Sequence, residues 1–447
     1  MVENYITTKI PFSILHLPLI LHSEFFIIHS SHYAIFMNII HYASLFVILF
    51  TLYGIAVGSY PAFRMNRATI ALVGAAVLIF IGAIPLEKAY DAVDLNTILL
   101  LFSMMIINGN LRISGFFKLV TAKIIALAHS PKQLLALIIF SSGILSAFFL
   151  NDTIVIIFTP LVIEVTLSLK RNPIPYLIGL VTAANIGSSA TIIGNPQNMI
   201  IGVSSGIPFA KYALYQTPPS LICLFIAWIV IVLIYKKEFG GSHFEKIELG
   251  KVRPYKPLLI KSIVASTLMI IAFFAGVSIP LAAFGGAALL LITRRLKPQR
   301  VFNEIDWSLL VFFSALFIVT KSIDTAGFGK YLALTLQPFL TQSTASFAVS
   351  SAVLSNIVSN VPAVLLFRPV IPALQNPEQA WMLLGMAATF AGNLTLIGSV
   401  ANLIVAESAK KYFINLSFVE YLKAGVLITI LSLTVGVIWF TFISLPA

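Results

Sequence analysis

Two related stretches of this sequence decide its fold: TIIGNPQNMI at residues 191–200 and TLIGSVANLI at residues 395–404. Both follow the pattern T-x-I-G-x-x-x-N-[M or L]-I, and both lie within apolar sequence. Glycine and asparagine are poor residues for a helix that faces lipid, but they suit an interrupted backbone that lines a cavity. One such interruption in each half of a membrane chain indicates the binding site of a secondary transporter. We therefore expect one broken helix in each half.

The composition indicates an integral membrane protein. Of the 447 residues, 59% are hydrophobic and 10% are charged, and the mean hydropathy is +0.99. Soluble domains contain about 25% charged residues. Long apolar runs favour helices over the short alternating strands of a β-barrel, so we expect an all-α polytopic membrane protein with about 10–12 transmembrane helices. Runs that approach the length of a span are residues 40–60, 68–85, 95–110, 218–235, 260–277 and 425–444.

The net charge of +12 follows the loops and does not indicate a nucleic-acid partner. Basic residues gather beside the apolar runs, at Arg64 and Arg67, at Lys170 and Arg171, and within residues 236–261 and 294–300. Loops rich in lysine and arginine face the cytoplasm. We therefore expect a multi-pass protein of the cell (inner) membrane, in contact with the lipid bilayer. The single cysteine, Cys223, lies in an apolar run and excludes disulfides and cysteine-rich metal sites.

Residues 1–36 are interpreted as a poorly defined N-terminal extension. They hold four of the seven histidines, at positions 16, 22, 29 and 32. The irregular spacing follows no metal-binding pattern, although a histidine metal site stays an alternative. The segment also lacks the basic start and the small-residue cleavage site of a signal peptide. Met37 precedes the first clear span, so we expect N-terminal helices over residues 37–86.

The distribution of basic residues predicts two repeats of opposite orientation. Residues 236–302 are interpreted as a basic cytoplasmic linker with connecting helices, because residues 236–261 contain seven lysines and arginines. Counting spans outward from this linker gives the two flanking segments opposite orientations. We therefore expect inverted repeats at residues 87–235 and 303–447.

An aspartate marks the first helix of each repeat. Val93-Asp94-Leu95 and Ile305-Asp306-Trp307 occupy equivalent positions. Each aspartate is expected to cap the start of its helix. The span count places Asp94 at the outer face and Asp306 at the inner face of the membrane.

A second paired motif supports the repeat. Asn151 begins the sequence Asn-Asp-Thr and lies nine residues before Pro160; Asn360 follows Ser359 and lies nine residues before Pro369. Both asparagines follow an apolar approach, so each repeat is expected to contain a re-entrant hairpin with a polar tip. The alternative is ordinary helix packing through small and polar residues, which does not explain why the motif is paired.

Around these motifs the sequence resembles the ion transporter superfamily. The resemblance lies in AANIGSSATIIGNPQN at residues 183–198 and AGNLTLIG at residues 391–398. That superfamily includes citrate–metal transporters, divalent anion–sodium symporters, arsenite permeases and sodium–proton antiporters. The resemblance covers residues 40–445. Within the superfamily, the sequence is most similar to the anion permeases grouped with citrate–metal transporters. It implies alternating-access transport of a small anion, coupled to Na+ or H+, with no further cofactor.

In the divalent anion symporters, Ser-Asn-Thr stands at both hairpin tips. Here Asn151 and Asn360 match the asparagine, and Ser359 matches the serine of the second tip. The first tip departs from the pattern because Asp152 places a carboxylate where the symporters have a neutral residue. A carboxylate inside a membrane is costly and often functional. Asp152 therefore fits proton or sodium coupling, and a helix cap is the alternative.

The motifs supply the candidate binding residues. Asparagine, threonine and carbonyl oxygens suit a hard cation such as Na+, whereas backbone N–H groups at broken-helix ends suit an anion. The sodium site is expected at Asn151, Asp152, Ser359 and Asn360. The whole candidate set is Asn151, Asp152, Thr153, Asn185, Gly187, Thr191, Gly194, Asn195, Asn198, Ser359, Asn360, Asn393, Thr395, Gly398 and Asn402.

Other classes of function fit less well. The chain has no Walker-type phosphate loop, H-E-x-x-H or G-x-S-x-G motif, so an enzyme is not expected. A channel is disfavoured because no ring of charges is evident. The solute is expected to be citrate, a dicarboxylate or an inorganic oxyanion. Arsenite efflux and Na+/H+ antiport stay open as alternative functions. The oligomeric state also stays open, with a homodimer as one possibility.

Overall fold

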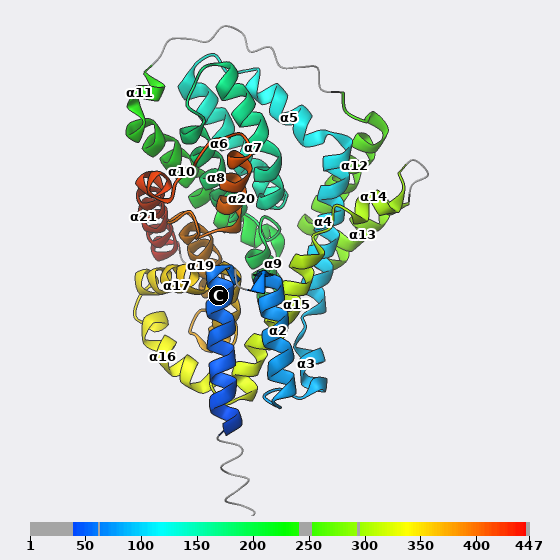
Figure 1. Ribbon diagram of the computed structural model, residues 1–447, viewed down its shortest axis with the longest axis vertical. Coiled ribbons are helices and arrows are strands. Elements are labelled where there is room, and N and C mark those ends of the chain that lie inside the picture. Colours follow the sequence, from blue (N-terminus) through cyan, green and yellow to red (C-terminus); the bar gives the residue numbers. More distant parts are fainter. Residues whose placement is uncertain (1–38, 61–62, 241–252, 293–295, 444–447) are drawn as a thin grey trace, which may run out of the picture.

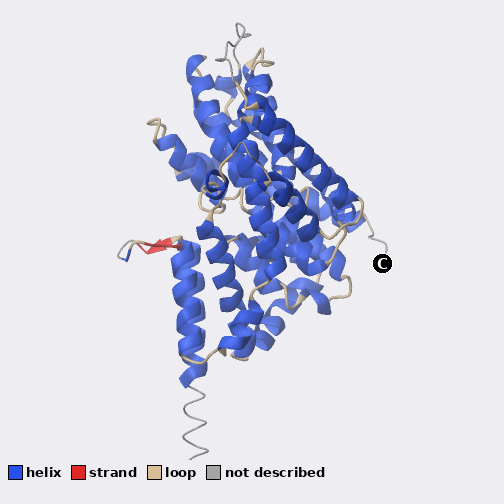
Figure 2. Cartoon of the chain, turned by 90° about the vertical axis from the view of Figure 1, so that its right-hand side faces the viewer, coloured by secondary structure: helices blue, strands red, loops and turns tan. Residues whose placement is uncertain are grey.

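The computed structural model describes residues 39–60, 63–240, 253–292 and 296–443. The expected extension at residues 1–36 lies outside this part of the chain. Helices form nearly all of the described structure (Figure 1). The one sheet among the described residues pairs β1 (Ser59–Tyr60) with β2 (Met65–Asn66) in antiparallel register. Figure 2 shows this small sheet projecting from the helical body.

Eight described helices are long and apolar enough to cross a membrane, which agrees with a polytopic all-α protein. They are Ile39–Val57, α4 (Leu95–Ser114), α6 (Pro131–Phe148), α7 (Asn151–Ser168), α10 (Phe209–Ile234), α12 (Lys256–Phe274), α15 (Trp307–Thr325) and α21 (Phe418–Phe442). Three shorter apolar helices accompany them: α2 (Arg67–Phe80), α13 (Ile279–Leu291) and α17 (Thr344–Val358).

Shorter elements connect these spans and complete the repeats. They are α3 (Leu86–Ala92), α5 (Phe116–Ile125), α8 (Pro173–Ser188), α9 (Pro196–Ser205), α11 (Lys236–Phe239), α14 (Pro298–Phe302), α16 (Gly329–Thr341), α18 (Asn360–Phe367), η2 (Ile371–Ala373), α19 (Pro377–Ala391) and α20 (Val400–Lys410).

The order of elements is the same in both repeats. Each repeat begins with a long helix and a short connecting helix, continues with a hairpin and a broken helix, and ends with a second long helix. The first repeat runs from α4 to α10 and the second from α15 to α21. Figure 1 shows α5 near one end of the molecule and its counterpart α16 near the other. The two repeats therefore have opposite orientations, as expected from the distribution of charge.

The helix breaks occur at the repeated motif, and the asparagine of that motif donates hydrogen bonds to the backbone carbonyls that each break leaves free. In the first break, the Asn198 amide donates to the carbonyl oxygens of Ser188 at 3.1 Å and Thr191 at 3.0 Å. In the second, Asn402 donates to Gly392 at 2.8 Å, and also to the carbonyl oxygen of Thr395 at 2.9 Å. A helix end leaves backbone carbonyls without partners. The asparagine side chains satisfy them, so the break is stable inside a protein core.

Each hairpin turns at an asparagine, but the two hairpins differ in length. α7 begins at Asn151 and passes through Pro160, whereas α18 begins at Asn360 and ends before Pro369. Proline removes a backbone donor and clashes with the preceding turn. A second proline, Pro372, follows directly in the second hairpin. The equal spacing from asparagine to proline therefore did not predict equal helices.

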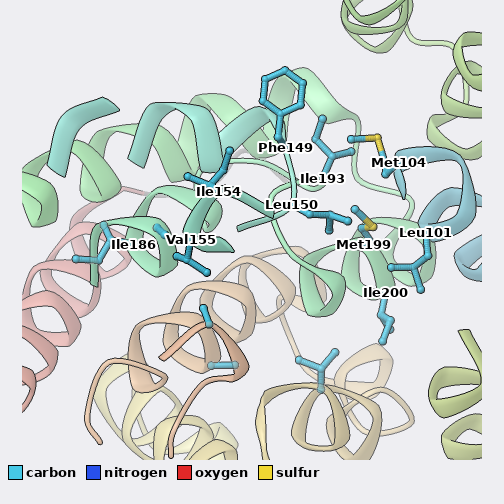
Figure 3. Packing of buried hydrophobic residues seen from close by; sticks show 14 of the residues in the cluster. Leu101, Met104, Phe149, Leu150, Ile154, Val155, Ile186, Ile193, Met199 and Ile200 are labelled. Atoms are coloured by element: carbon cyan, nitrogen blue, oxygen red, sulfur yellow. The ribbon is translucent and has the colours of Figure 1, made fainter. Parts of the chain in front are cut away.

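Apolar residues anchor the first hairpin tip. Figure 3 shows Phe149 and Leu150, which precede α7, close to Met104 of α4 and to Ile193 and Met199 of the first broken helix. All five side chains are at most 7% exposed. Membrane helices are held together by close van der Waals packing, so this buried cluster holds the polar tip in place.

Gly187 permits close packing of the hairpin against the broken helix. A β-carbon at residue 187 would overlap the backbone of Gly143, where α8 crosses α6. We expect Gly187→Val to reduce the yield of monodisperse detergent-purified protein and to lower its melting temperature strongly, because neither backbone can move without separating the two helices. Gly285→Val on α13 is the control, since a β-carbon there meets no atom within 4 Å. Equal melting temperatures for the two variants would contradict this packing role.

Candidate functional site

Both hairpin tips line one cavity of about 440 Å³. The first tip contributes Asn151 and Asp152, and the second contributes Ser359 and Asn360. The starts of α2, α9, α15 and α20 also contribute to the lining. The four residues expected at a sodium site therefore lie at one place, although they come from different repeats.

Three charged side chains line this cavity: Arg67, Asp152 and Asp306. Asp306 caps α15 by accepting a hydrogen bond from the Leu309 amide at 3.1 Å. Arg67 begins α2, which packs along α15, so Arg67 and Asp306 belong to one helix pair. Asp152 interacts electrostatically with both of them. At full ionisation the cavity therefore carries one net negative charge.

The Arg67 guanidinium is half-buried and makes no close ion pair. Among the described residues, no carboxylate oxygen lies within 4.0 Å of it, and no hydrogen bond from it is formed. It lies against the backbone of Gly58, with Nε 3.4 Å from the position that a β-carbon at residue 58 would take. Arginine carries five N–H donors in a planar fork. This guanidinium can therefore receive a carboxylate or an oxyanion.

The first tip presents a buried oxygen without a partner. Asn151 donates its amide hydrogen to Asn185 Oδ1 at 3.2 Å, and its backbone N–H donates to the Gly194 carbonyl at 3.1 Å. Its own Oδ1 is buried and has no hydrogen-bond partner among the described residues. Buried polar atoms are nearly always paired, so this oxygen is suited to a ligand.

The second tip is strained. Ser359 has φ +79° and ψ 158°, a backbone region that essentially only glycine adopts, at a cost of about 1–3 kcal/mol for other residues. Asn360 follows it and accepts a hydrogen bond from the Ser355 hydroxyl at 2.7 Å. Strain of this kind persists where the surrounding structure enforces it, and it is concentrated at functional sites.

Asparagines behind the cavity join the two repeats. Asn185 of α8 donates to Asn393 Oδ1 at 2.9 Å and to Asn402 Oδ1 at 3.0 Å. Asn393 in turn donates to the Thr182 carbonyl at 3.2 Å, and the Ser399 hydroxyl donates to Asn185 Oδ1 at 3.2 Å. Of these residues only Ser399 lines the cavity. The network therefore fastens the two broken helices to each other.

The other expected site residues surround the cavity without lining it. Thr153 lines a smaller adjoining cavity. The Thr191 hydroxyl donates to the Ala147 carbonyl, and Asn195 caps α9 by accepting from the Asn198 amide at 2.8 Å. The remaining expected residues lie within the helix breaks or in the helices beside them. They are Asn185, Gly187, Thr191, Gly194, Asn195, Asn198, Asn393, Thr395, Gly398 and Asn402.

Sequence reasoning missed the contributions of Arg67 and Asp306. Arg67 was expected in a cytoplasmic loop, but it is the first residue of α2 and lines the cavity. Asp306 was expected only to cap a helix, as Asp94 does in the first repeat by accepting from the Thr97 amide at 3.2 Å. The second carboxylate oxygen of Asp94 pairs with Arg368 at 3.1 Å, whereas Asp306 lines the central cavity. No local sequence signal separates the two aspartates, because their neighbours are set by the packing of distant helices.

The comparisons with known proteins point to one family of transporters. The family model described as "Citrate transporter" matches residues 45–382. The chain is 27% identical to the "Putative transporter arsB" of Dictyostelium discoideum, over 83% of this chain and 87% of that protein. It is 28% identical to the "Silicon efflux transporter LSI3" of Oryza sativa subsp. japonica, over 85% of this chain and 93% of that protein.

Similarity extends to a bacterial membrane protein and a solved structure. The "46 kDa membrane protein" of Mycobacterium leprae is 28% identical over 88% of this chain and 97% of its own length. The crystal structure of the Alcanivorax borkumensis YdaH transporter covers 90% of this chain and 97% of its own, with a TM-score of 0.55 and 16% identity. At that identity the likeness supports the fold alone.

Proposed function

Because the chain belongs to the citrate transporter family, we propose that it is a secondary transporter that moves a small anion across the cell (inner) membrane by alternating access. The observation that carries the proposal is the central cavity, where polar tips from two inverted repeats meet beside Arg67. Paired discontinuous helices at a repeat interface are the usual site of a transported solute.

The charges in the cavity support coupling to a cation. Asp152 and Asp306 outnumber Arg67, so an anion alone would enter a site that is already negative. A proton or a sodium ion that neutralises one carboxylate removes this repulsion. The Asn151 oxygen and the second tip add the oxygen ligands that a hard cation prefers. We therefore propose that the anion moves together with Na+ or H+.

The proposed solutes are citrate, a dicarboxylate or an inorganic oxyanion. Citrate follows from the family description. A second candidate function is efflux of arsenite or a related oxygen-rich solute, favoured by the relatives named arsB and silicon efflux transporter. Na+/H+ antiport on the same scaffold is a third, because Asp152 supports ion exchange without any anion.

Transport by purified protein in liposomes tests the proposal. We expect radiolabelled citrate, succinate or phosphate to accumulate above equilibrium under an inward Na+ or H+ gradient at zero membrane potential. An ionophore that collapses the gradient should release the accumulated solute. Cation exchange that occurs without any of these anions, or arsenite movement alone, would favour the second or third candidate.

Arg67 is expected to attract the anion. Arg67→Gln should weaken the apparent affinity for the transported anion by about 10- to 100-fold, because a charge-assisted hydrogen-bond pair is lost. The measurement is the concentration dependence of uptake, with the amount of inserted protein held equal. The control is Arg64→Gln, since Arg64 is exposed and does not line the cavity. An unchanged affinity in Arg67→Gln would exclude Arg67 from the anion site.

A further inference from the structure

A second, smaller cavity adjoins the central one. Its volume is about 110 Å³, and it shares Asp152 and Asp306 with the central cavity. Thr153 lies in its wall beside Asp152, and Asn108 of α4 also lines it. Three helices of different parts of the chain, α4, α7 and α15, therefore contribute oxygen-bearing side chains to a space that is large enough for an ion and a few waters.

Asn108 is the unexplained group in this cavity. Its side chain is 3% exposed, and neither Nδ2 nor Oδ1 has a hydrogen-bond partner among the described residues. In the neighbouring Asn110 only Oδ1 lacks a partner, because Nδ2 donates to the Ile106 carbonyl of its own helix at 2.8 Å. A buried amide without any partner is rare and is expected to serve a ligand. Asn108 therefore points to an occupant of the small cavity.

The charges around the small cavity favour a monovalent cation. Arg112 and Glu304 also line it, but they form an ion pair with each other. Asp152 and Asp306 repel each other, and Arg67 offsets only one of the two charges. A single positive charge balances the remaining carboxylate.

We propose that the small cavity is a sodium site formed by the carboxylates of Asp152 and Asp306 and the amide oxygen of Asn108. Side-chain oxygens are the ligands that a hard cation prefers. The Asn108 amide nitrogen is left to face a water in the same cavity. This site lies beside the two hairpin tips and uses residues outside both tip motifs, apart from Asp152. It rests on the proposed function, because it identifies the coupling ion of that transporter.

The position of the site gives sodium a structural effect. Asp152 belongs to the first hairpin, whereas Asn108 lies in α4 and Asp306 caps the start of α15. A cation bound by all three holds the hairpin against that helix pair. Sodium also removes the repulsion between the two carboxylates, which leaves Arg67 free for an anion in the adjoining cavity.

Sodium-dependent thermal stability of the purified full-length protein tests the site directly. NaCl replaces KCl at constant ionic strength, and no organic anion is present. We expect the wild-type melting temperature to rise with NaCl. Asn108→Leu and Asp306→Asn should need at least about 10-fold more NaCl for the same rise, because each loses one charged or polar ligand. Asparagine also caps helices well, so Asp306→Asn keeps the start of α15 intact.

Two variants serve as matched controls. Asn110→Leu makes the same substitution two residues further along α4, outside both cavities. Asp94→Asn makes the same change at the equivalent helix cap of the first repeat. Both should keep the wild-type sodium dependence. A wild-type response in Asn108→Leu and Asp306→Asn, or a wild-type protein stabilised equally by KCl and NaCl, would overturn the proposal.

The readout separates this inference from the proposed function. If the protein moves no anion but sodium still stabilises it through Asn108 and Asp306, the sodium site stands and the anion transporter fails. If the anion is transported with protons, and sodium has no effect on stability at any pH, the sodium site fails and the transporter stands.

Discussion

Asn151→Ala and Asn360→Ala are each expected to abolish anion transport while leaving the protein inserted in the membrane. Each asparagine stands at a hairpin tip that lines the central cavity. Asn151 also carries a buried oxygen without a partner, and Asn360 accepts from Ser355 at 2.7 Å. Alanine removes the side-chain amide that would contact the solute, together with the hydrogen bonds of that amide. The rate of transport should therefore fall by at least about 100-fold.

The measurement is uptake of labelled citrate, succinate or phosphate into proteoliposomes with equal amounts of each variant. Asn172→Ala and Asn376→Ala are matched controls, one in each repeat. These asparagines are exposed N-caps that accept from the Ile174 and Gln379 amides, each at 3.1 Å. Losing a cap costs about 1 kcal/mol and leaves the cavity unchanged. Wild-type uptake by a properly inserted Asn151 or Asn360 variant would refute the paired-tip site.

Asp152→Asn should uncouple transport from the cation gradient. The carboxylate interacts with Asp306 and Arg67 across the cavity, and the substitution removes its charge with almost no change in shape. Without that charge a cation loses its strongest ligand, whereas Arg67 is retained for the anion. We expect gradient-driven accumulation to fall by at least about 100-fold, while exchange of labelled for unlabelled anion at equal concentrations continues.

Comparison of accumulation with exchange measures this effect. Glu164→Gln is the control, because Glu164 is an exposed carboxylate on the same helix α7. It should leave both activities at the wild-type rate. Gradient-driven accumulation that survives in Asp152→Asn would show that another group couples the ion. Loss of exchange together with accumulation would assign Asp152 to the anion site.

The helix breaks and hairpin tips were predictable because their chemistry is local. A glycine and an asparagine at fixed spacing interrupt a helix and then satisfy the freed carbonyls, as Asn198 and Asn402 do at identical offsets. The same local argument placed Asn151 and Asn360 at the starts of α7 and α18. Repetition of both motifs in the two halves made the inverted repeat visible in the sequence.

The sequence did not predict which polar residues line the cavity and which ones join the helices to each other. Asn185 and Asn393 resemble ligands in sequence, yet they bond to each other at 2.9 Å behind the cavity. Arg67 resembles a loop residue that sets topology, yet it lines the cavity. Asn108 has no motif around it at all. Each outcome depends on which distant helices lie opposite the residue, and the hydrophobic pattern of a single helix does not contain that information.

The sequence by itself determined a membrane-embedded helical protein with two interrupted repeats and a polar tip in each, because apolar length, helix-breaking residues and loop charge act over a few residues. Only the tertiary structure decided that Asp152, Asp306 and Arg67 share one cavity, and that Asn108 faces two of them. Charges that lie far apart in the chain interact through space, and their neighbours are set by the packing of α2, α4, α7 and α15.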